Sequence, residues 1–142
     1  MAATTRGATL ARAITTCVEP TDDAVAGLGG LFTDDAMVWS PNLMAVGLES
    51  LAALLGARET AFTDVTVEFD SLGVLGDKGF AEFRVTATFS GPFVIDDDVV
   101  IEPNGRQLLL GAAAMADFVD GKIASLRAYF DDASLLEQML PA

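Results

Sequence analysis

The sequence feature that most constrains the fold is a long hairpin pattern over residues 106–131. Asp120-Gly121 lies at its centre, and an Asp-Gly pair readily adopts the positive φ angles of a tight two-residue turn. The first arm, residues 108–118, is apolar at nearly every position, which is typical of a strand covered on both faces. The second arm, residues 124–130, alternates apolar and polar side chains, as a half-buried strand does. We therefore predict two paired strands, of which the first needs cover on both faces.

The composition limits the classes of function. A chain of 142 residues with 51% hydrophobic residues predicts one folded domain, residues 1–142. The net charge of −13 argues against binding to nucleic acid or to an anionic membrane, since phosphates attract clustered Lys and Arg. No apolar run reaches the ~18 residues of a membrane span, and we read no signal peptide at the N-terminus. The single cysteine, Cys17, excludes an internal disulfide and suits the cytoplasm.

The sequence contains no histidine, so it lacks the commonest general base and the commonest zinc ligand. The acidic run at residues 96–98 offers consecutive carboxylates without further ligands, which is typical of a solvated loop rather than a cation site. Cys17 falls on an apolar helix face, where a role in the core is the simpler interpretation. We therefore expect no metal and no cofactor.

Periodicity and turn residues predict helices first and strands afterwards. The predicted helices are residues 4–17, 21–31, 48–58 and 132–139, and the predicted strands are residues 36–40, 63–75 and 80–90 besides the two hairpin arms. Residues 91–105 are predicted to form a long loop. This order is typical of an α+β fold, in which helices cover one face of a curved, mainly antiparallel sheet.

Several short motifs lie between residues 21 and 140. They are Phe32-Thr33-Asp34-Asp35-Ala36, Ser40-Pro41, Gly47, Asp120-Gly121-Lys122-Ile123 and Arg127-Ala128-Tyr129-Phe130-Asp131. Together they resemble the NTF2-like superfamily, and within it most closely the SnoaL-like polyketide cyclases, limonene epoxide hydrolase and ketosteroid isomerase. The resemblance implies a cone, in which a strongly curved sheet wraps round N-terminal helices and leaves a deep apolar pocket.

The chain departs from these relatives at their acid–base positions. Limonene epoxide hydrolase carries an Arg-x-Asp motif where this chain has Val85-Thr86-Ala87, and a second acid where this chain has Ala128. The base of ketosteroid isomerase corresponds to Ser40, and its protonated acid lies on the strand where this chain has alanines at positions 112, 114 and 116. The resemblance therefore implies the family pocket without its known acids.

Strand alternation, together with the resemblance, predicts which residues line that pocket. The predicted substrate-binding residues are Val38, Trp39, Phe69, Phe83, Val85, Ala87, Phe89, Leu110, Ala112, Ala114, Leu126, Ala128 and Phe130. Trp39 points outward by alternation, and it is included because a strand end can twist its side chain over the pocket mouth. Neighbouring alanines are expected to leave room for a ligand. Ser40 and Asn42, at the end of the first strand, are the predicted catalytic residues; the alternative is that they only form a turn.

The resemblance implies a cyclase that closes a ring in a large apolar polyketide intermediate of antibiotic biosynthesis. Binding a reactive conformer would supply the rate, as in an intramolecular cycloaddition. An acid–base isomerase or epoxide-opening cyclase using Glu68 or Glu82 is the first alternative. Glu82 and Arg84 are, however, predicted to form a surface pair on the outer sheet face. A non-catalytic protein that binds lipophilic ligands is the second alternative.

Two further expectations concern assembly and access. Leu109, Ala113 and Met115 make the outer face of the first hairpin arm apolar, which predicts a homodimer through that face. Tyr129 is expected to face the same interface. The loop at residues 91–105 is expected to be mobile and to gate the pocket.

Overall fold

The computed structural model describes residues 2–57, 61–96 and 98–141. Its helices are α1 (Ala2–Val18), α2 (Asp22–Ala26), the 3-10 turn η1 (Leu28–Gly30), α3 (Leu48–Gly56) and α4 (Asp132–Met139). Its strands are β1 (Phe32–Ser40), β2 (Leu43–Val46), β3 (Phe62–Leu75), β4 (Lys78–Phe89), β5 (Phe93–Asp96), β6 (Val99–Ile101), β7 (Gln107–Val119) and β8 (Lys122–Phe130).

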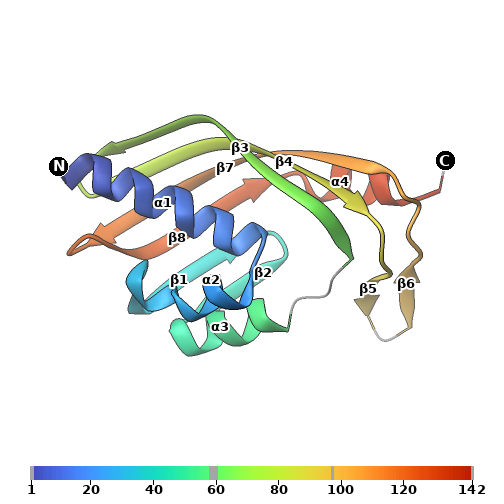
Figure 1. Cartoon of the computed structure of the whole chain (residues 1–142), viewed down its shortest axis with the longest axis horizontal. Coiled ribbons are helices and arrows are strands. Elements are labelled where there is room, and N and C mark those ends of the chain that lie inside the picture. Colours follow the sequence, from blue (N-terminus) through green and yellow to red (C-terminus); the bar gives the residue numbers. More distant parts are fainter. Residues whose placement is uncertain (1, 58–60, 97, 142) are drawn as a thin grey trace.

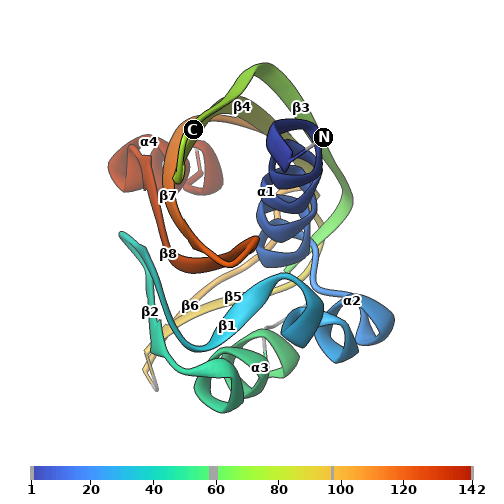
Figure 2. The ribbon, with the colours of Figure 1, turned by 90° about the vertical axis from the view of Figure 1, so that its left-hand side faces the viewer.

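The main sheet has six strands in the order β2-β1-β8-β7-β4-β3. All neighbours in it are antiparallel except β1 and β8, which are parallel. The sheet bends strongly around α1 without closing into a barrel, and α3 packs under β1 and β2 (Figures 1 and 2). The α+β prediction, with a mainly antiparallel curved sheet and helices on its inner side, is confirmed.

The hairpin that dominates the sequence pattern is the pair β7–β8. Asp120 and Gly121 have φ angles of 50° and 81°, so both turn residues adopt the positive φ angles predicted for this pair. β7 lies between β4 and β8, and its inward side chains are buried. Its outward Leu109 and Met115 are 54% and 40% exposed, so the chain itself covers only one of the two faces.

The helices form where capping and apolar spacing favour them. Leu10, Ala13 and Ile14 put one face of α1 into the core. Thr21 caps α2 by accepting a hydrogen bond from the backbone N–H of Ala24 at 3.2 Å. Asp131 caps α4 in the same way, through the backbone N–H groups at positions 133 and 134.

Three element predictions needed correction. The second helix ends at Ala26 rather than residue 31, because its glycines weaken the helix and the chain continues as the 3-10 turn η1. β1 begins at Phe32 rather than residue 36, because Phe32 pairs with Ile123 of β8 ahead of an irregularity in the register. The third helix ends at Gly56, and residue 58, its predicted end, lies outside the described residues.

Two short pairings were missed by sequence periodicity. β2 returns along β1 after a two-residue turn at Pro41-Asn42, and only four residues take part. β5 and β6 form a separate hairpin within the predicted loop, where Phe93 pairs with Ile101 (Figure 1). Such short strands carry too few residues to show a period. The predicted mobility of this segment stays a prediction.

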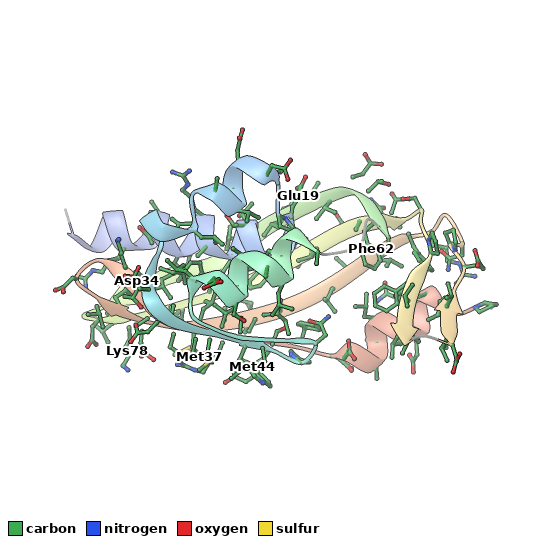
Figure 3. All side chains as sticks on the ribbon, turned by 90° about the horizontal axis from the view of Figure 1, so that it is seen from below. Glu19, Asp34, Met37, Met44, Phe62 and Lys78 are labelled. Atoms are coloured by element: carbon green, nitrogen blue, oxygen red, sulfur yellow. The ribbon has the colours of Figure 1, made fainter. Side chains whose placement is uncertain are left out.

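The buried side chains form two separate clusters. The first unites α1, α3 and the inner face of the sheet, from Leu10 to Leu126. The second is small and consists of Ala61, Phe89, Leu108 and Met139. Phe62, at the start of β3, packs against the second cluster at the end of the molecule near β5 and β6 (Figure 3). The two clusters lie toward opposite ends of the long strands.

Candidate functional site

The candidate site is the inner face of the curved sheet, which is built as rows of side chains across neighbouring strands. One row consists of Phe69, Phe83, Ala112 and Phe130. The next row consists of Ala81, Ala114 and Ala128. Twelve of the predicted pocket residues share this face: Val38, Phe69, Phe83, Val85, Ala87, Phe89, Leu110, Ala112, Ala114, Leu126, Ala128 and Phe130.

These residues differ in how far solvent reaches them. The buried ones are Val38, Phe83, Ala87, Phe89, Ala112, Ala114 and Leu126. The half-buried ones are Phe69, Val85, Leu110, Ala128 and Phe130. The half-buried side chains therefore mark the part of the inner face that a small molecule can reach without displacing the core.

The predicted open space beside Ala114 is absent. Ala114 is 1% exposed and belongs to the same buried cluster as Leu10 and Ile14 of α1. The surrounding side chains of this cluster fill the space beside Ala114, so this alanine leaves no room for a ligand. Ala128, in the same row, is half-buried and remains accessible to solvent.

Trp39 lies on the opposite face from the other predicted pocket residues. Its ring packs against the ring of Tyr129, with 5.4 Å between ring centroids and a tilt of 52°. Alternation along β1 turns Val38 inward and Trp39 outward, and no local twist at the strand end reverses it. The prediction that Trp39 covers the pocket mouth is therefore corrected.

Ser40 and Asn42 flank the turn between β1 and β2. The Ser40 hydroxyl donates a hydrogen bond to the Asn42 side-chain oxygen at 2.9 Å. Ser40 pairs with Leu43 across the turn, and Asn42 is exposed. Both side chains thus lie at a rim of the sheet, and the Asn42 amide nitrogen is the donor of the pair that this hydrogen bond does not use.

The charged side chains of the long strands lie on the outer face. Arg84 bridges Glu68 at 2.9 Å and Asp70 at 3.0 Å, and these carboxylates raise the pKa of Arg84, with Asp70 contributing most. The predicted surface pair of Glu82 with Arg84 is therefore replaced by pairs across to β3. A bulge between Phe69 and Ser71 brings Asp70 round to the arginine.

A second charged group lies further along the outer face. Asp117 contacts Lys78 and also accepts a hydrogen bond from Arg127 at 2.9 Å. The two cations lower the pKa of Asp117, with Lys78 contributing most, and Asp117 in turn raises the pKa of Lys78. This group ties β4, β7 and β8 together on the side away from the candidate site.

The outer face also carries a shallow concavity of ≈ 360 Å³ that sequence reasoning missed. Its lining residues are Asp70, Glu82, Phe83, Arg84, Gly111, Ala112, Ala113 and Tyr129. Gly111 has no side chain, and a β-carbon added there would meet no other atom within 4 Å. A glycine inside a strand pattern was the available signal, since it often marks a close approach by another group.

Among the residues that the structure describes, no group of three or more His, Cys, Asp or Glu side chains is arranged to hold a metal ion. Residue 97, in the acidic run at residues 96–98, lies outside the described residues. None of the described helices is long and apolar enough to cross a membrane.

Solved structures with the same fold support the architecture. A SnoaL-like polyketide cyclase candidate from Jannaschia sp. CCS1 superposes with a TM-score of 0.81 at 18% identity, covering 99% of this chain and 95% of that one. AclR, a hydroxylase candidate from Streptomyces galilaeus, gives 0.72 at 21% identity, covering 96% and 97%. An LEH-like epoxide hydrolase of M. tuberculosis gives 0.69 at 13% identity, covering 96% and 90%. These neighbours identify the fold as NTF2-like and confirm that prediction.

The family follows from the sequence itself. The model of the SnoaL-like polyketide cyclases matches residues 8–139, which is nearly the whole chain. The chain therefore belongs to the SnoaL-like polyketide cyclase family. No curated protein matches the chain with statistical significance.

Proposed function

We propose that this chain closes a ring in a large apolar polyketide intermediate, mainly by binding a reactive conformer against the inner face of the sheet. One observation carries the proposal. Every inward position of β3, β4, β7 and β8 that the register defines is apolar, whereas Glu68, Glu82 and Arg84 lie outside. A site of this composition binds by contact area, at roughly 25 cal/mol per Å² of apolar surface removed from water.

Ring closure by conformer trapping needs no acid or base. Holding two reacting ends of one flexible chain together converts a rare encounter into a frequent one, which can lower a barrier by several kcal/mol. An intramolecular cycloaddition suits such a site, because its new σ bonds form at the expense of π bonds and no proton is transferred. The half-buried Phe69, Val85, Leu110 and Phe130 would provide the contact surface.

Ser40 and Asn42 remain the proposed catalytic residues. Because the Ser40 hydroxyl already donates its hydrogen bond to the Asn42 side-chain oxygen, the Asn42 amide N–H is the group proposed to polarise a substrate carbonyl at the rim. Ser40 would orient that amide.

The alternatives make different demands on the same chain. An acid–base isomerase or epoxide-opening cyclase would need Glu68 or Glu82, yet both are exposed on the outer face and Glu68 pairs with Arg84. A non-catalytic binder of lipophilic ligands would use the same inner face without turnover. The proposed location is the cytoplasm, in agreement with a sequence whose one cysteine cannot form a disulfide within the chain.

The proposed assembly is a homodimer through the outer sheet face. Leu109 and Met115 are exposed large apolar side chains on either side of Gly111 and Ala113. Tyr129 lines the same shallow concavity as Gly111 and Ala113. A second copy would supply the cover that the outer face of β7 lacks within one chain.

The test is turnover of a linear polyene polyketide followed by chromatography, with the rate measured from about pH 5 to about pH 8. We expect a cyclised product and a rate that changes little with pH. Binding of the polyene without product would support the non-catalytic reading. A rate that falls on the acid side would point to a carboxylate base and contradict conformer trapping.

A further inference from the structure

β7 extends beyond its neighbour β8 at one end. β8 ends at Phe130, which pairs with Ala112, whereas β7 begins at Gln107. Residues 107–111 therefore have β4 on one side and no strand on the other. An open strand edge leaves backbone N–H and C=O groups that need partners.

Gln138 of α4 satisfies this open edge. Its side-chain oxygen accepts from the backbone N–H of Leu109 at 2.9 Å, and its side-chain nitrogen donates to the backbone C=O of Leu109 at 2.9 Å. The carboxamide thus takes the place of a peptide group in a neighbouring strand. Asn104 adds a second tie, donating to the backbone C=O groups of Gln138 at 3.2 Å and Met139 at 3.3 Å.

The apolar attachment of α4 is limited. Met139 is buried in the small second cluster with Ala61, Phe89 and Leu108, and Leu135 packs against its edge. α4 has only eight residues, which is too short for a helix to be stable on its own. Segments with few buried contacts open at a lower free energy than the body of a fold. The second cluster shares no buried residue with the first.

Only part of the inner face is accessible to a large ligand in the conformation described. Phe83, Ala87 and Ala112 are buried, and Phe89 and Leu108 belong to the second cluster. A ligand that contacts these side chains needs one packed element to move. α1 is held in the larger cluster, whereas α4 is held by the smaller one and by a few hydrogen bonds.

We propose that α4 is a hinged cap that opens to admit a large apolar ligand to the inner face, and that the Gln138–Leu109 hydrogen-bond pair is its latch. The hinge is the chain at Asp131, between the end of β8 and the start of α4. The ligand class rests on the proposed function, whereas the opening is a property of the empty protein. The two can therefore fail separately.

The experiment measures opening by thiol labelling in a Cys17→Ser background. Leu108→Cys places a thiol under the cap at a side chain that is 3% exposed, and Ala114→Cys places one in the body of the fold. We expect position 108 to label faster than position 114. Gln138→Ala should raise the rate at position 108 about tenfold, as expected from losing two hydrogen bonds, and leave position 114 unchanged. Glu137→Ala, an exposed change on the same helix, should alter neither rate.

Equal labelling rates at positions 108 and 114 would mean that only global unfolding exposes them, and would overturn the cap. An equal acceleration at both positions by Gln138→Ala would overturn it as well, because Gln138 would then support the whole fold. If a cysteine variant does not fold, hydrogen exchange of the unmodified chain replaces the labelling experiment. The amides of Leu109, Leu135 and Leu140 should then share one opening free energy that is lower than the opening free energy of the Ala114 amide. If these three amides were as strongly protected as the Ala114 amide, the cap would be overturned.

Neither measurement uses a substrate. A protein that opens in this way but converts no polyene contradicts the proposed function alone. A protein that converts the polyene without this opening contradicts the cap alone.

Discussion

The rings of Trp39 and Tyr129 pack against each other on the outer face of the sheet, with their centroids 5.4 Å apart. They come from β1 and β8, the one parallel pair in the sheet, and they face away from the candidate site. Tilted aromatic pairs of this kind add about 0.5–1.5 kcal/mol beyond their buried area. Tyr129 nevertheless stays exposed, next to the similarly exposed Met115. The outer face therefore carries an apolar surface that a single chain leaves in water.

The first prediction concerns assembly through this surface. Met115→Asp should convert a dimer into a monomer at micromolar concentration, because it puts a charge into the centre of an apolar interface. Sedimentation velocity measures the change. Leu54→Asp is the matched control, since Leu54 is also exposed but lies on α3 and not on the sheet. A wild-type monomer, or a Met115→Asp variant that sediments like the parent, would contradict the interface.

The second prediction is that enlarging Ala114 and enlarging Ala128, which lie in the same row of the inner face, have different effects. Ala114→Leu should lower the free energy of unfolding by ~1–3 kcal/mol, because its surroundings are already packed by the first cluster. Ala128→Leu should change stability less and abolish most product formation, because the added side chain enters the accessible part of the inner face. Urea unfolding and turnover are measured for both variants. The opposite pattern would show that the accessible region lies over Ala114.

The third prediction concerns the acids on the outer face. Glu68→Gln and Glu82→Gln should each keep most of the turnover, since neither side chain lies on the inner face. Circular dichroism confirms that the variants are folded. A folded variant of either kind without activity would favour the acid–base alternative over conformer trapping.

The fourth prediction follows from the lowered pKa of Asp117, which lies beside Lys78 and Arg127. A carboxyl whose pKa is lower in the folded than in the unfolded state stabilises the fold above the unfolded value of about 3.9. That contribution is lost as the pH falls through the folded-state value. Asp117→Asn should therefore be less stable than the parent at neutral pH, and the difference should shrink in acid and in high salt.

Thermal unfolding at several pH values measures this difference, with Glu82→Gln as the control. A difference that persists unchanged in strong acid would mean that Asp117 acts through packing and not through charge. The raised pKa of Lys78 has the opposite sign, so its contribution is lost only as the pH rises through the folded-state value.

Much of the fold was predictable because it depends on local patterns. The alternation in β4 and β7 assigned Phe83, Val85 and Leu110 to the inner face before any partner strand was known, since successive side chains of a strand point to opposite sides. The Asp120-Gly121 turn set the first pairs of β7 with β8, Val119 with Lys122 and Phe118 with Ile123, and a shift of register beyond Phe118 sets the rest. The helix N-caps at Thr21 and Asp131 likewise depend on residues only two or three positions apart in the sequence.

The candidate site was predictable only in part, because its accessibility depends on elements distant in the sequence. Whether space is left beside an alanine is decided by the side chains that pack over it, and the first cluster encloses Ala114 while leaving Ala128 half-buried. The partners of Arg84 depended on a bulge in β3, which no period reveals.

The sequence by itself determined which side chains share a face, because strand alternation is a property of the local backbone. Only the tertiary structure decided what covers each face, because packing joins residues far apart along the chain. The bonds from Gln138 to Leu109 connect α4 to the open edge of β7 across 29 residues. No pattern in either segment predicts these bonds. A glutamine near a helix end is common, and its role here depends on the open edge of β7 that lies beside it.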